Sequence, residues 1–271
     1  VDPKNIKYAT GNAHIRVIYW KPLNYMEQLF PQLRNSSLLK LVKDLDIDIV
    51  RGFSPFYSGF FAVQASRVLN AKVLLSIHSN FDQLRQFYLQ DKQFLRFIKY
   101  SALAYNIEGS TLNSAHLVQP AYVFAEEYCK AKVQEYEKIK TVYNRVYSTV
   151  FFPDKKRQIN KNGPLKIISI GNLDPRKGQR TLLKSLSLTD FDFRLTLIGK
   201  GGDKKYLEKL VKKYNFEKKV NMIESMPNSK LCALYNQNDV FALPISYGGI
   251  CIPALEASAC GLAVIYPKDK K

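Results

Sequence analysis

The chain has 271 residues, 46% of them hydrophobic and 24% charged, which allows one large or two ordinary domains and excludes disorder as the default state. Lysine and arginine outnumber aspartate and glutamate by 41 to 23, and the resulting net charge of +18 is spread over both halves. Such a surface favours phosphate-rich partners, namely nucleotides, anionic lipids or nucleic acid, or it is a solvated surface without a partner.

The cysteines and the ends of the chain indicate its compartment. Four cysteines lie far apart without a CxxC pair, which predicts buried thiols in a reducing cytosol and neither a metal site nor a disulfide framework. No apolar run reaches the ~18 residues that a membrane span needs, and the first residues lack a signal peptide. We therefore expect a cytoplasmic protein. Because the chain begins without Met and ends just after a strand-like run, we also expect a fragment cut at both ends.

The first half alternates short β-branched runs with helical patterns. This alternation indicates βαβ units and a parallel sheet, and the nearly continuous apolar strands predict helices on both faces. The predicted strands are 15–20, 47–51, 72–78, 116–119 and 139–143, and the predicted helices are 37–45, 58–69, 93–108 and 121–130.

A polar segment bounded by prolines, 151–164, is predicted as a linker, and the alternation resumes after it. The predicted strands are then 166–171, 194–199, 220–224, 240–245 and 262–266, and the predicted helices are 179–188, 203–214, 229–237 and 253–260. In the last helix Pro253 is expected at the first position and Gly261 just past the end. The fold class is therefore α/β, with two Rossmann-like domains at 1–150 and 151–271.

Three strand exits of the second domain carry candidate ligand residues, because ligands of open α/β sheets bind at the carboxyl ends of strands. The first exit carries Arg176 and Lys177, which suit a diphosphate or form a solvated basic turn. The second, 199–202, is rich in glycine and allows a close ligand approach or is an ordinary turn. At the third, Glu256 is expected in the first helical turn, where it accepts hydrogen bonds from ribose hydroxyls or only stabilises the helix.

The spacing of these motifs resembles a known family. Residues 166–266, above all 169–178 and 248–265, resemble the nucleotide-sugar domain of the GT-B glycosyltransferases of family four, which act with retention. The first half resembles the acceptor domain of that family over 48–82, 114–128 and 138–153. The resemblance implies a GT-B fold, two Rossmann-like domains facing a cleft, truncated at both ends.

The resemblance also implies roles for individual residues. Lys177 takes the place of the lysine that holds the donor diphosphate, and Glu256 that of the glutamate that binds the ribose. His78 falls where the family has a histidine at the sugar-transfer centre; otherwise it is a satisfied histidine at the end of a strand. The other residues expected to contact the nucleotide sugar are Gly171, Asn172, Arg176, Gly199, Gly248, Gly249 and Ile250.

Three positions depart from the family pattern. Asn172 stands where the family has an arginine, so one charge near the diphosphate is lost, at a cost of about 1–2 kcal/mol, unless Arg176 replaces it. Gly248 stands where a first glutamate contacts the donor sugar, and Cys251 replaces a glycine beside the sugar. These departures leave open a catalytically silent protein that still binds a nucleotide sugar or a partner.

The expected function is retaining transfer of a hexosyl group from a UDP- or GDP-sugar to a glycan, lipid or other hydroxyl acceptor. Positive side chains and a helix N-terminus would stabilise the departing diphosphate, so we expect neither a cofactor nor a metal. The basic surface suits peripheral contact with an anionic membrane. A nucleic-acid partner is not expected, because it would rest on net charge alone without any recognition motif.

Overall fold

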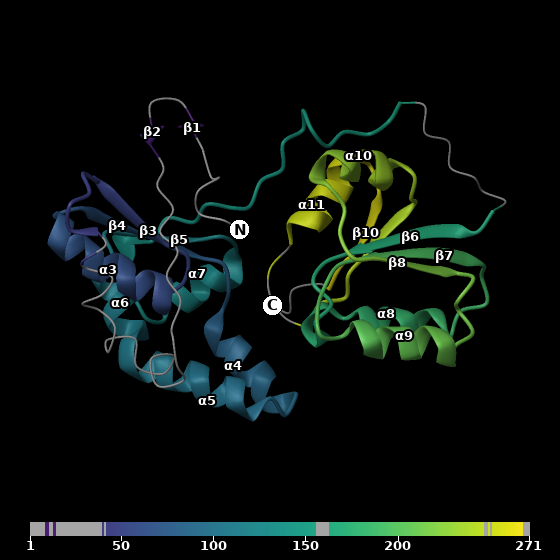
Figure 1. Ribbon diagram of the computed structural model, residues 1–271, viewed down its shortest axis with the longest axis horizontal. Helices are drawn as coiled ribbons and strands as arrows, with labels where there is room; N and C mark the ends of the chain where they lie inside the picture. The colour runs from purple at the N-terminus through teal and green to yellow at the C-terminus, as the bar shows by residue number, and fades with distance from the viewer. Residues whose placement is uncertain are drawn as a thin grey trace. The chain divides into compact units, whose positions relative to one another are not determined.

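The computed structural model of the chain describes residues 9–10, 13–14, 40, 42–155, 163–246, 249 and 251–267 (Figure 1). It has two compact units: unit 1 comprises Val1–Pro120 and Ala125–Thr141, and unit 2 comprises Ala121–Phe124 and Val142–Lys271. The crossing between Thr141 and Val142 precedes the predicted domain boundary by nine residues. Phe151, the first residue of the predicted linker, is buried in unit 2 with its ring 6.0 Å from that of Tyr235.

The first part of the chain forms a parallel three-stranded sheet in the order β3-β4-β5, with helix α3 packed against β3 and β4. A separate antiparallel pair is formed by β1 and β2. The elements are β1 (Ala9–Thr10), β2 (Ala13–His14), β3 (Ile49–Gly52), α3 (Tyr57–Leu69), β4 (Lys72–Ile77), α4 (Phe81–Gln90), α5 (Phe94–Leu103), the π-helical turn η3 (Ala104–Glu108), α6 (Gly109–Ser114), β5 (Leu117–Pro120), α7 (Val123–Lys130) and the 3-10 turn η4 (Tyr136–Lys138).

Two differences from the sequence prediction concern this part of the chain. The predicted strand 139–143 is wrong: Ile139 forms only an isolated parallel bridge with Val118 before the chain leaves the unit. Helix α4 was missed, although Asn80 caps it by accepting hydrogen bonds from the backbone N–H groups of Asp82 and Gln83, both at 3.1 Å. The predicted strand 15–20 and residues 37–39 and 41 of the predicted helix 37–45 lie outside the described residues.

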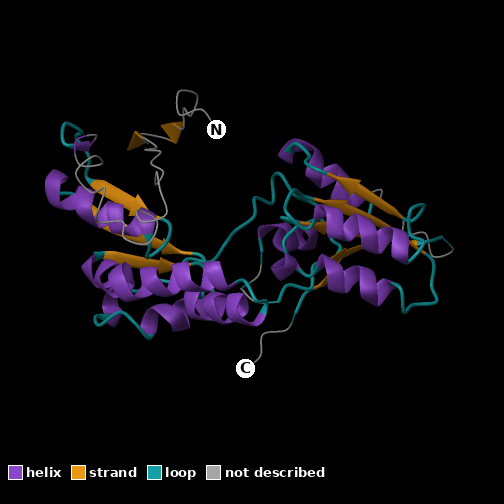
Figure 2. Cartoon of the chain, turned by 60° about the horizontal axis from the view of Figure 1, so that its bottom comes forward, coloured by secondary structure: helices purple, strands orange, loops and turns teal. Residues whose placement is uncertain are grey.

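The second part of the chain forms a parallel five-stranded sheet with helices on both faces, as predicted (Figure 2). In the strand order β10-β9-β6-β7-β8, β6 lies in the middle. Strands β7 and β8 lie on one side of β6 and strands β9 and β10 on the other, so the order in which the strands are added reverses between β6 and β9. The elements are β6 (Leu165–Ile170), the 3-10 turn η5 (Pro175–Lys177), α8 (Gln179–Leu186), β7 (Phe193–Ile198), α9 (Lys204–Lys213), β8 (Val220–Ile223), α10 (Asn228–Asn236), β9 (Val240–Ala242), α11 (Ile252–Ala259) and β10 (Ala263–Ile265).

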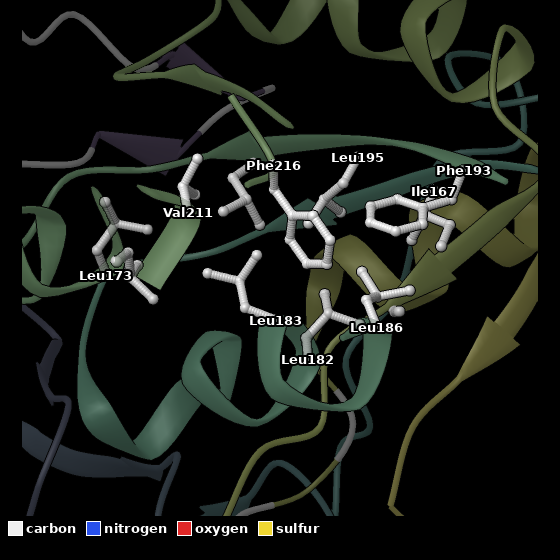
Figure 3. Packing of buried hydrophobic residues seen from close by; sticks show 12 residues of the cluster. Ile167, Leu173, Leu182, Leu183, Leu186, Phe193, Leu195, Val211 and Phe216 are labelled. Carbon is white, nitrogen blue, oxygen red and sulfur yellow. The ribbon is translucent and has the colours of Figure 1, made fainter. Parts of the chain in front are cut away.

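Each face of the second sheet has its own apolar core. On one face Ile167 and Leu195 of the strands pack with Leu183 of α8 and Leu207 of α9 (Figure 3). On the other face Ile168 and Phe241 pack with residues of α10 and α11. Adjacent strand residues such as 167 and 168 are therefore both buried, which is why these strands read as continuous apolar runs.

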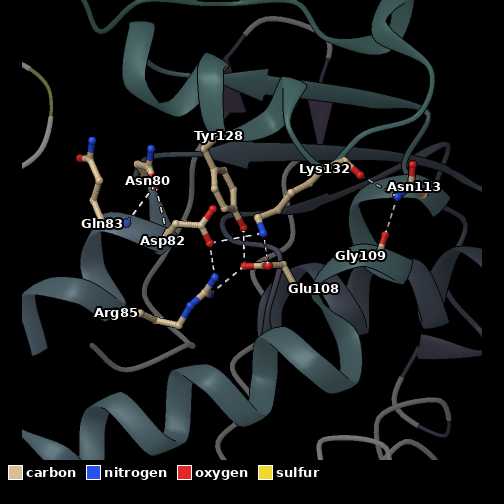
Figure 4. Close-up of polar contacts among 9 residues, drawn as sticks. All are labelled: Asn80, Asp82, Gln83, Arg85, Glu108, Gly109, Asn113, Tyr128 and Lys132. Atoms are coloured by element: carbon tan, nitrogen blue, oxygen red, sulfur yellow. Dashed lines mark hydrogen bonds and ion pairs between the residues drawn. The ribbon is translucent and has the colours of Figure 1, made fainter. Parts of the chain in front are cut away.

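A buried polar cluster joins α4, the π-helical turn and α7 in unit 1 (Figure 4). Glu108, 3% exposed, accepts hydrogen bonds from Tyr128 Oη at 2.6 Å and Arg85 Nη1 at 3.2 Å. Lys132 Nζ lies 3.0 Å from Glu108 Oε2 and 3.3 Å from Asp82 Oδ1, and Arg85 also pairs with Asp82. Two cations balance two anions, so the buried charge of Glu108 is fully compensated.

The cysteines divide into two pairs by burial. Cys129 and Cys260 are fully buried, and burial raises the pKa of each thiol to about 12, whereas Cys232 and Cys251 are half-buried. Only a thiolate reacts quickly with alkylating agents. We expect iodoacetamide at neutral pH to modify Cys232 and Cys251 well before the other two, as read by peptide mass spectrometry. Equal rates for all four in the folded chain would contradict this burial pattern, and equal rates in urea provide the control.

Candidate functional site

The candidate site begins at the loop between β6 and α8. Asp174 accepts a hydrogen bond from the backbone N–H of Arg176 at 3.0 Å and so starts the 3-10 turn. The same carboxylate holds the Arg176 guanidinium by two contacts, Nε to Oδ1 at 2.7 Å and Nη2 to Oδ2 at 3.0 Å. The charge of Arg176 is thus compensated within the loop. Arg176 therefore does not replace the positive charge of the arginine that the family pattern has at position 172.

Lys177 ends the 3-10 turn, directly before the start of α8. Its side chain is half-buried, and no ion pair involves its ammonium group within the described ranges. No side chain among the described residues caps α8, so the first backbone N–H groups of the helix remain available at its N-terminus. A helix N-terminus carries a partial positive charge, so Lys177 and α8 together favour an anion at this end of the helix.

Two backbone contacts fix this loop against the loop that follows β9. Ser246 donates its N–H to the carbonyl oxygen of Arg176 at 2.8 Å. Gly178 has a φ of 73°, and a Cβ there would lie 1.8 Å from the carbonyl oxygen of Pro244. Only glycine combines this left-handed conformation with so close an approach. β6 and β9 are the neighbours at which the strand order reverses, the place where open α/β sheets bind ligands.

The loop after β7 joins the same edge. Gly199 passes so close to the first loop that a Cβ would lie 1.9 Å from the carbonyl oxygen of Gly171. Gly171 in turn donates its N–H to Ile198 at 3.0 Å. The structure therefore brings Gly171, Lys177 and Gly199 onto adjoining loops at the carboxyl ends of the strands. The packing of these loops accounts for the glycine at position 199.

Gln179 is a polar residue at this edge that the sequence analysis missed. It is the first residue of α8 and is 2% exposed. Its Nε2 donates to the carbonyl oxygen of Asn172 at 3.2 Å, while its Oε1 is buried without a hydrogen-bond partner among the described residues. The exposed side chain of Asn172 is not used in this contact. The only sequence signal for Gln179 was its place after the glycine at the helix start.

Glu256 lies in the second turn of α11, which corrects the expected first-turn position. The helix begins at Ile252, so Pro253 takes its second position and no acidic residue occupies the first turn. Gly261 follows the helix with a φ of 77°, as expected. Since the effect of the helix dipole fades beyond the first turn, this dipole does not explain Glu256.

The carboxylate of Glu256 is buried beside a tyrosine. The residue is 7% exposed, and its Oε2 accepts a hydrogen bond from Tyr235 Oη at 2.9 Å. Burial raises the pKa of Glu256, and the hydrogen bond from Tyr235 opposes this shift in part. The described part of the chain provides no hydrogen bond to Oε1 and no hydrogen bond or ion pair between Glu256 and Lys177. A buried carboxylate with one unused oxygen can accept hydrogen bonds from a hydroxyl-bearing ligand.

His78 directly follows β4 in unit 1 and is exposed. Its ring stacks with that of Phe53 at 6.2 Å between centroids, and the Arg51 guanidinium lies 4.8 Å from the Phe53 ring. Partial burial and the charge of Arg51 lower the pKa of His78. The imidazole is therefore mostly neutral at pH 7 and can donate or accept a hydrogen bond.

The remaining predicted site residues follow β9. Gly249 accepts a hydrogen bond from Tyr266 Oη at 2.9 Å through its carbonyl oxygen. Gly248 and Ile250 lie outside the described residues. A hollow of about 460 Å³ between Leu186 and Lys219 lies at the opposite, amino ends of β7 and β8, away from all these loops.

Comparison with known proteins identifies the part of the chain that carries these loops. Residues 151–269 match the family described as glycosyl transferases group 1. These residues form a group 1 glycosyltransferase domain. A relative from Methanocaldococcus jannaschii, an uncharacterized glycosyltransferase, is 28% identical over 167 residues, or 58% of this chain and 43% of its own. Lys177, Gly199 and Glu256 all belong to the matched glycosyltransferase domain.

Solved structures extend the likeness in fold beyond this domain. Sucrose-phosphate synthase from Thermosynechococcus elongatus superposes with a TM-score of 0.75 at 19% identity, over 91% of this chain and 62% of its own. HepE from Anabaena, solved in complex with UDP-glucose, gives 0.66 at 16% identity, over 90% and 65%. The chain thus has the α/β fold of GT-B glycosyltransferases, as expected. It spans less than two thirds of each of these three relatives.

Proposed function

We propose that this chain transfers a hexosyl group from a UDP- or GDP-sugar to a hydroxyl acceptor, with retention. The observation that carries the proposal is the arrangement of Lys177 beside the uncapped N-terminus of α8, at the reversal of strand order in a glycosyltransferase domain. This edge offers a lysine and free backbone N–H groups to one anion, as a diphosphate requires. The Anabaena structure that contains UDP-glucose has the same fold, which supports this choice of donor.

The charge of the departing diphosphate would be stabilised by groups that are already in place. Lys177 would contact the phosphate oxygens, and the first N–H groups of α8 would add their partial positive charge. Because the contacts to Pro244 and Ser246 fix the loop before the donor binds, little reorganisation would be needed. We propose on this basis that transfer proceeds without a metal ion or cofactor.

Glu256 would bind the ribose of the donor through Oε1, while Tyr235 holds Oε2. A charged acceptor inside a protein forms stronger hydrogen bonds with hydroxyl groups than a neutral one does. Burial raises the pKa of Glu256. Ribose binding would therefore be stronger at a pH above this pKa, where the carboxylate is ionised, than at a pH below it. The proposed role therefore predicts pH-dependent nucleotide affinity.

The acceptor would be a sugar, lipid or other hydroxyl compound, with His78 near the transferred sugar. A mostly neutral imidazole at the end of β4 would position a hydroxyl group or stabilise developing charge. A lipid acceptor would suit the basic surface of the chain, so the proposal includes peripheral contact with an anionic membrane. Within the described ranges no helix is long and apolar enough to cross a bilayer.

A second candidate function is nucleotide-sugar binding without transfer. It is favoured by the ion pair between Arg176 and Asp174, which compensates the charge of Arg176. Because Asn172 is neutral, Lys177 is then the cation in this loop that remains to stabilise a departing diphosphate. Calorimetry with UDP-glucose and GDP-mannose, combined with an assay of donor hydrolysis, separates the two functions. Turnover supports transfer, whereas binding without turnover, with every acceptor class tested, supports the silent protein.

Replacement of Lys177 by alanine tests the donor site directly. A hydrogen bond to a charged group contributes about 1.5–3 kcal/mol, so we expect Lys177→Ala to weaken UDP binding by about 10- to 100-fold in calorimetry. Lys205→Ala is the matched control, because Lys205 is an exposed lysine in the first turn of the neighbouring helix α9. Equal losses of affinity in both variants would contradict the proposed diphosphate site.

A further inference from the structure

Two cysteines of unit 2 that the sugar-transfer proposal does not use lie in contact. Cys260 directly follows α11, and its thiol donates to Cys232 Sγ of α10 at a sulfur–sulfur distance of 3.9 Å. Asn236 Nδ2 also donates to Cys232 Sγ, at 3.6 Å. The two thiols are 28 positions apart in the sequence, so the fold brings them together. Two neighbouring thiols can exchange with a disulfide and form a disulfide of their own.

The two sulfurs differ in their access to solvent. Cys260 is fully buried, and burial together with its contact to Cys232 raises the pKa of its thiol to about 12. Cys260 therefore stays protonated at neutral pH. Cys232 is half-buried, so it is the sulfur of the pair that a dissolved oxidant can reach. A reachable thiol with a second thiol beside it is the arrangement in which one sulfur reacts first and the other resolves the product.

Cys251 provides an internal control, because it is half-buried like Cys232 but lies far from Cys260. Cys251 and Cys260 stand at opposite ends of α11, about 13 Å apart along the helix at 1.5 Å per residue. A disulfide requires Cα atoms within about 7 Å of each other. Cys251 can therefore react with a small oxidant but cannot form a disulfide with Cys260.

We propose that Cys232 and Cys260 form a reversible disulfide by exchange with a small-molecule disulfide, such as glutathione disulfide. The Cys232 thiolate attacks one sulfur of the oxidant, whose S–S bond breaks; one glutathione leaves as a thiolate and takes up the proton that Cys232 lost. Cys260 then loses its proton and attacks Cys232 Sγ, and the second glutathione leaves with that proton. Two protein thiols are oxidised, and one small disulfide is reduced to two thiols. Because the second step is intramolecular, proximity offsets the small thiolate fraction of Cys260.

The disulfide connects the two helices that hold the proposed ribose-binding carboxylate. Cys232 lies one turn before Tyr235 in α10, and Cys260 donates its backbone N–H to the carbonyl oxygen of Glu256 at 3.0 Å. A disulfide bond is about 2.05 Å long, so the two sulfurs must approach by about 1.9 Å. This movement displaces Glu256 from the position in which Tyr235 holds it, and oxidation thereby weakens nucleotide binding. The effect on binding rests on the proposed function, whereas the disulfide itself does not.

Incubation of the full chain with oxidised glutathione tests the disulfide. We expect peptide mass spectrometry to find a disulfide between Cys232 and Cys260 that dithiothreitol reverses, while Cys251 carries glutathione or stays free. In Cys260→Ala the reaction should stop at a glutathione adduct on Cys232, and Cys251→Ser should form the disulfide to the same extent as the wild-type chain. A wild-type chain that accumulates the adduct on Cys232 without a disulfide, or that does not react at Cys232, would overturn the inference.

Calorimetry with UDP tests the effect on the donor site. The Cys251→Ser background serves for both redox states, so that glutathione on Cys251 plays no part. We expect the oxidised chain to bind UDP about fivefold more weakly than the reduced chain, at the lower end of the usual coupling between two sites. Adding Cys232→Ser should remove this difference. Equal affinities in the two redox states would overturn the effect on binding. A reduced chain without UDP affinity would overturn the donor site itself, and the disulfide mapping is independent of that result.

Discussion

The Glu108→Ala variant is expected to be less stable than the wild-type chain by about 3–5 kcal/mol, the usual cost of breaking a buried ion pair from one side. Glu108 is almost fully buried and receives contacts from Arg85, Tyr128 and Lys132. Its removal leaves two cations facing a single carboxylate, Asp82, together with a buried hydroxyl group that has lost its acceptor. Urea unfolding followed by far-UV circular dichroism measures the change.

A matched control for this experiment lies in the same unit. Glu135 pairs with Lys138 at 3.3 Å, but its side chain is 73% exposed. Exposed ion pairs contribute little, so Glu135→Ala should change the free energy of unfolding by about 0.5 kcal/mol or less. If Glu108→Ala proved equally mild, the cluster would not hold α4, the π-helical turn and α7 together.

Replacing Glu256 by glutamine is expected to move nucleotide affinity and stability in opposite directions. Loss of the charged acceptor should weaken UDP binding by about 10- to 100-fold, on the basis of about 1.5–3 kcal/mol for a hydrogen bond to a charged group. The same change removes a buried charge while keeping an oxygen that can accept from Tyr235, so the variant should be more stable than wild type at pH 7. Calorimetry and urea unfolding measure the two effects.

The stability difference between the Glu256→Gln variant and the wild-type chain should depend on pH. Burial raises the pKa of Glu256 above the ordinary 4.5, so between the two values the folded chain binds more protons than the unfolded chain. The contribution of Glu256 to stability is therefore present below pH 4.5 and is lost as pH rises through the raised pKa. The advantage of Glu256→Gln should grow over this window. An advantage that stays constant from pH 4 to pH 8 would contradict the burial of this carboxylate.

The sheet of unit 2 could be predicted from the sequence because its strands are apolar on both faces. Ile167 and Ile168 point into different cores, and such a pair can occur only in a sheet covered by helices on both sides. The helices of that part have clear starts and ends, such as Gly178 before α8 and Gly261 after α11. In contrast, α4 was missed even though its buried residues Phe81, Leu84 and Tyr88 follow the i, i+3, i+7 spacing of an amphipathic helix.

The environment of the site residues could not be predicted, because it depends on contacts between distant positions. Arg176 and Lys177 are equivalent as neighbouring cations in the sequence, yet Asp174 holds the former and not the latter. The burial of Glu256 depends on Tyr235, which is 21 positions away, and on where α11 begins. Sequence spacing located the edge of the sheet, but the charges that remain available there follow from the packed structure.

The contact between Gly178 and Pro244 has a consequence for how specificity can evolve or be engineered in this domain. The backbones of two loops meet there with no room for a methyl group. The loop that carries Lys177 therefore tolerates few amino-acid substitutions at position 178. Asn172, by contrast, projects an exposed side chain from the same loop and uses only its carbonyl oxygen in holding Gln179. An exchange of the amide at position 172 would therefore change the proposed donor site while the backbone of the loop stays unchanged.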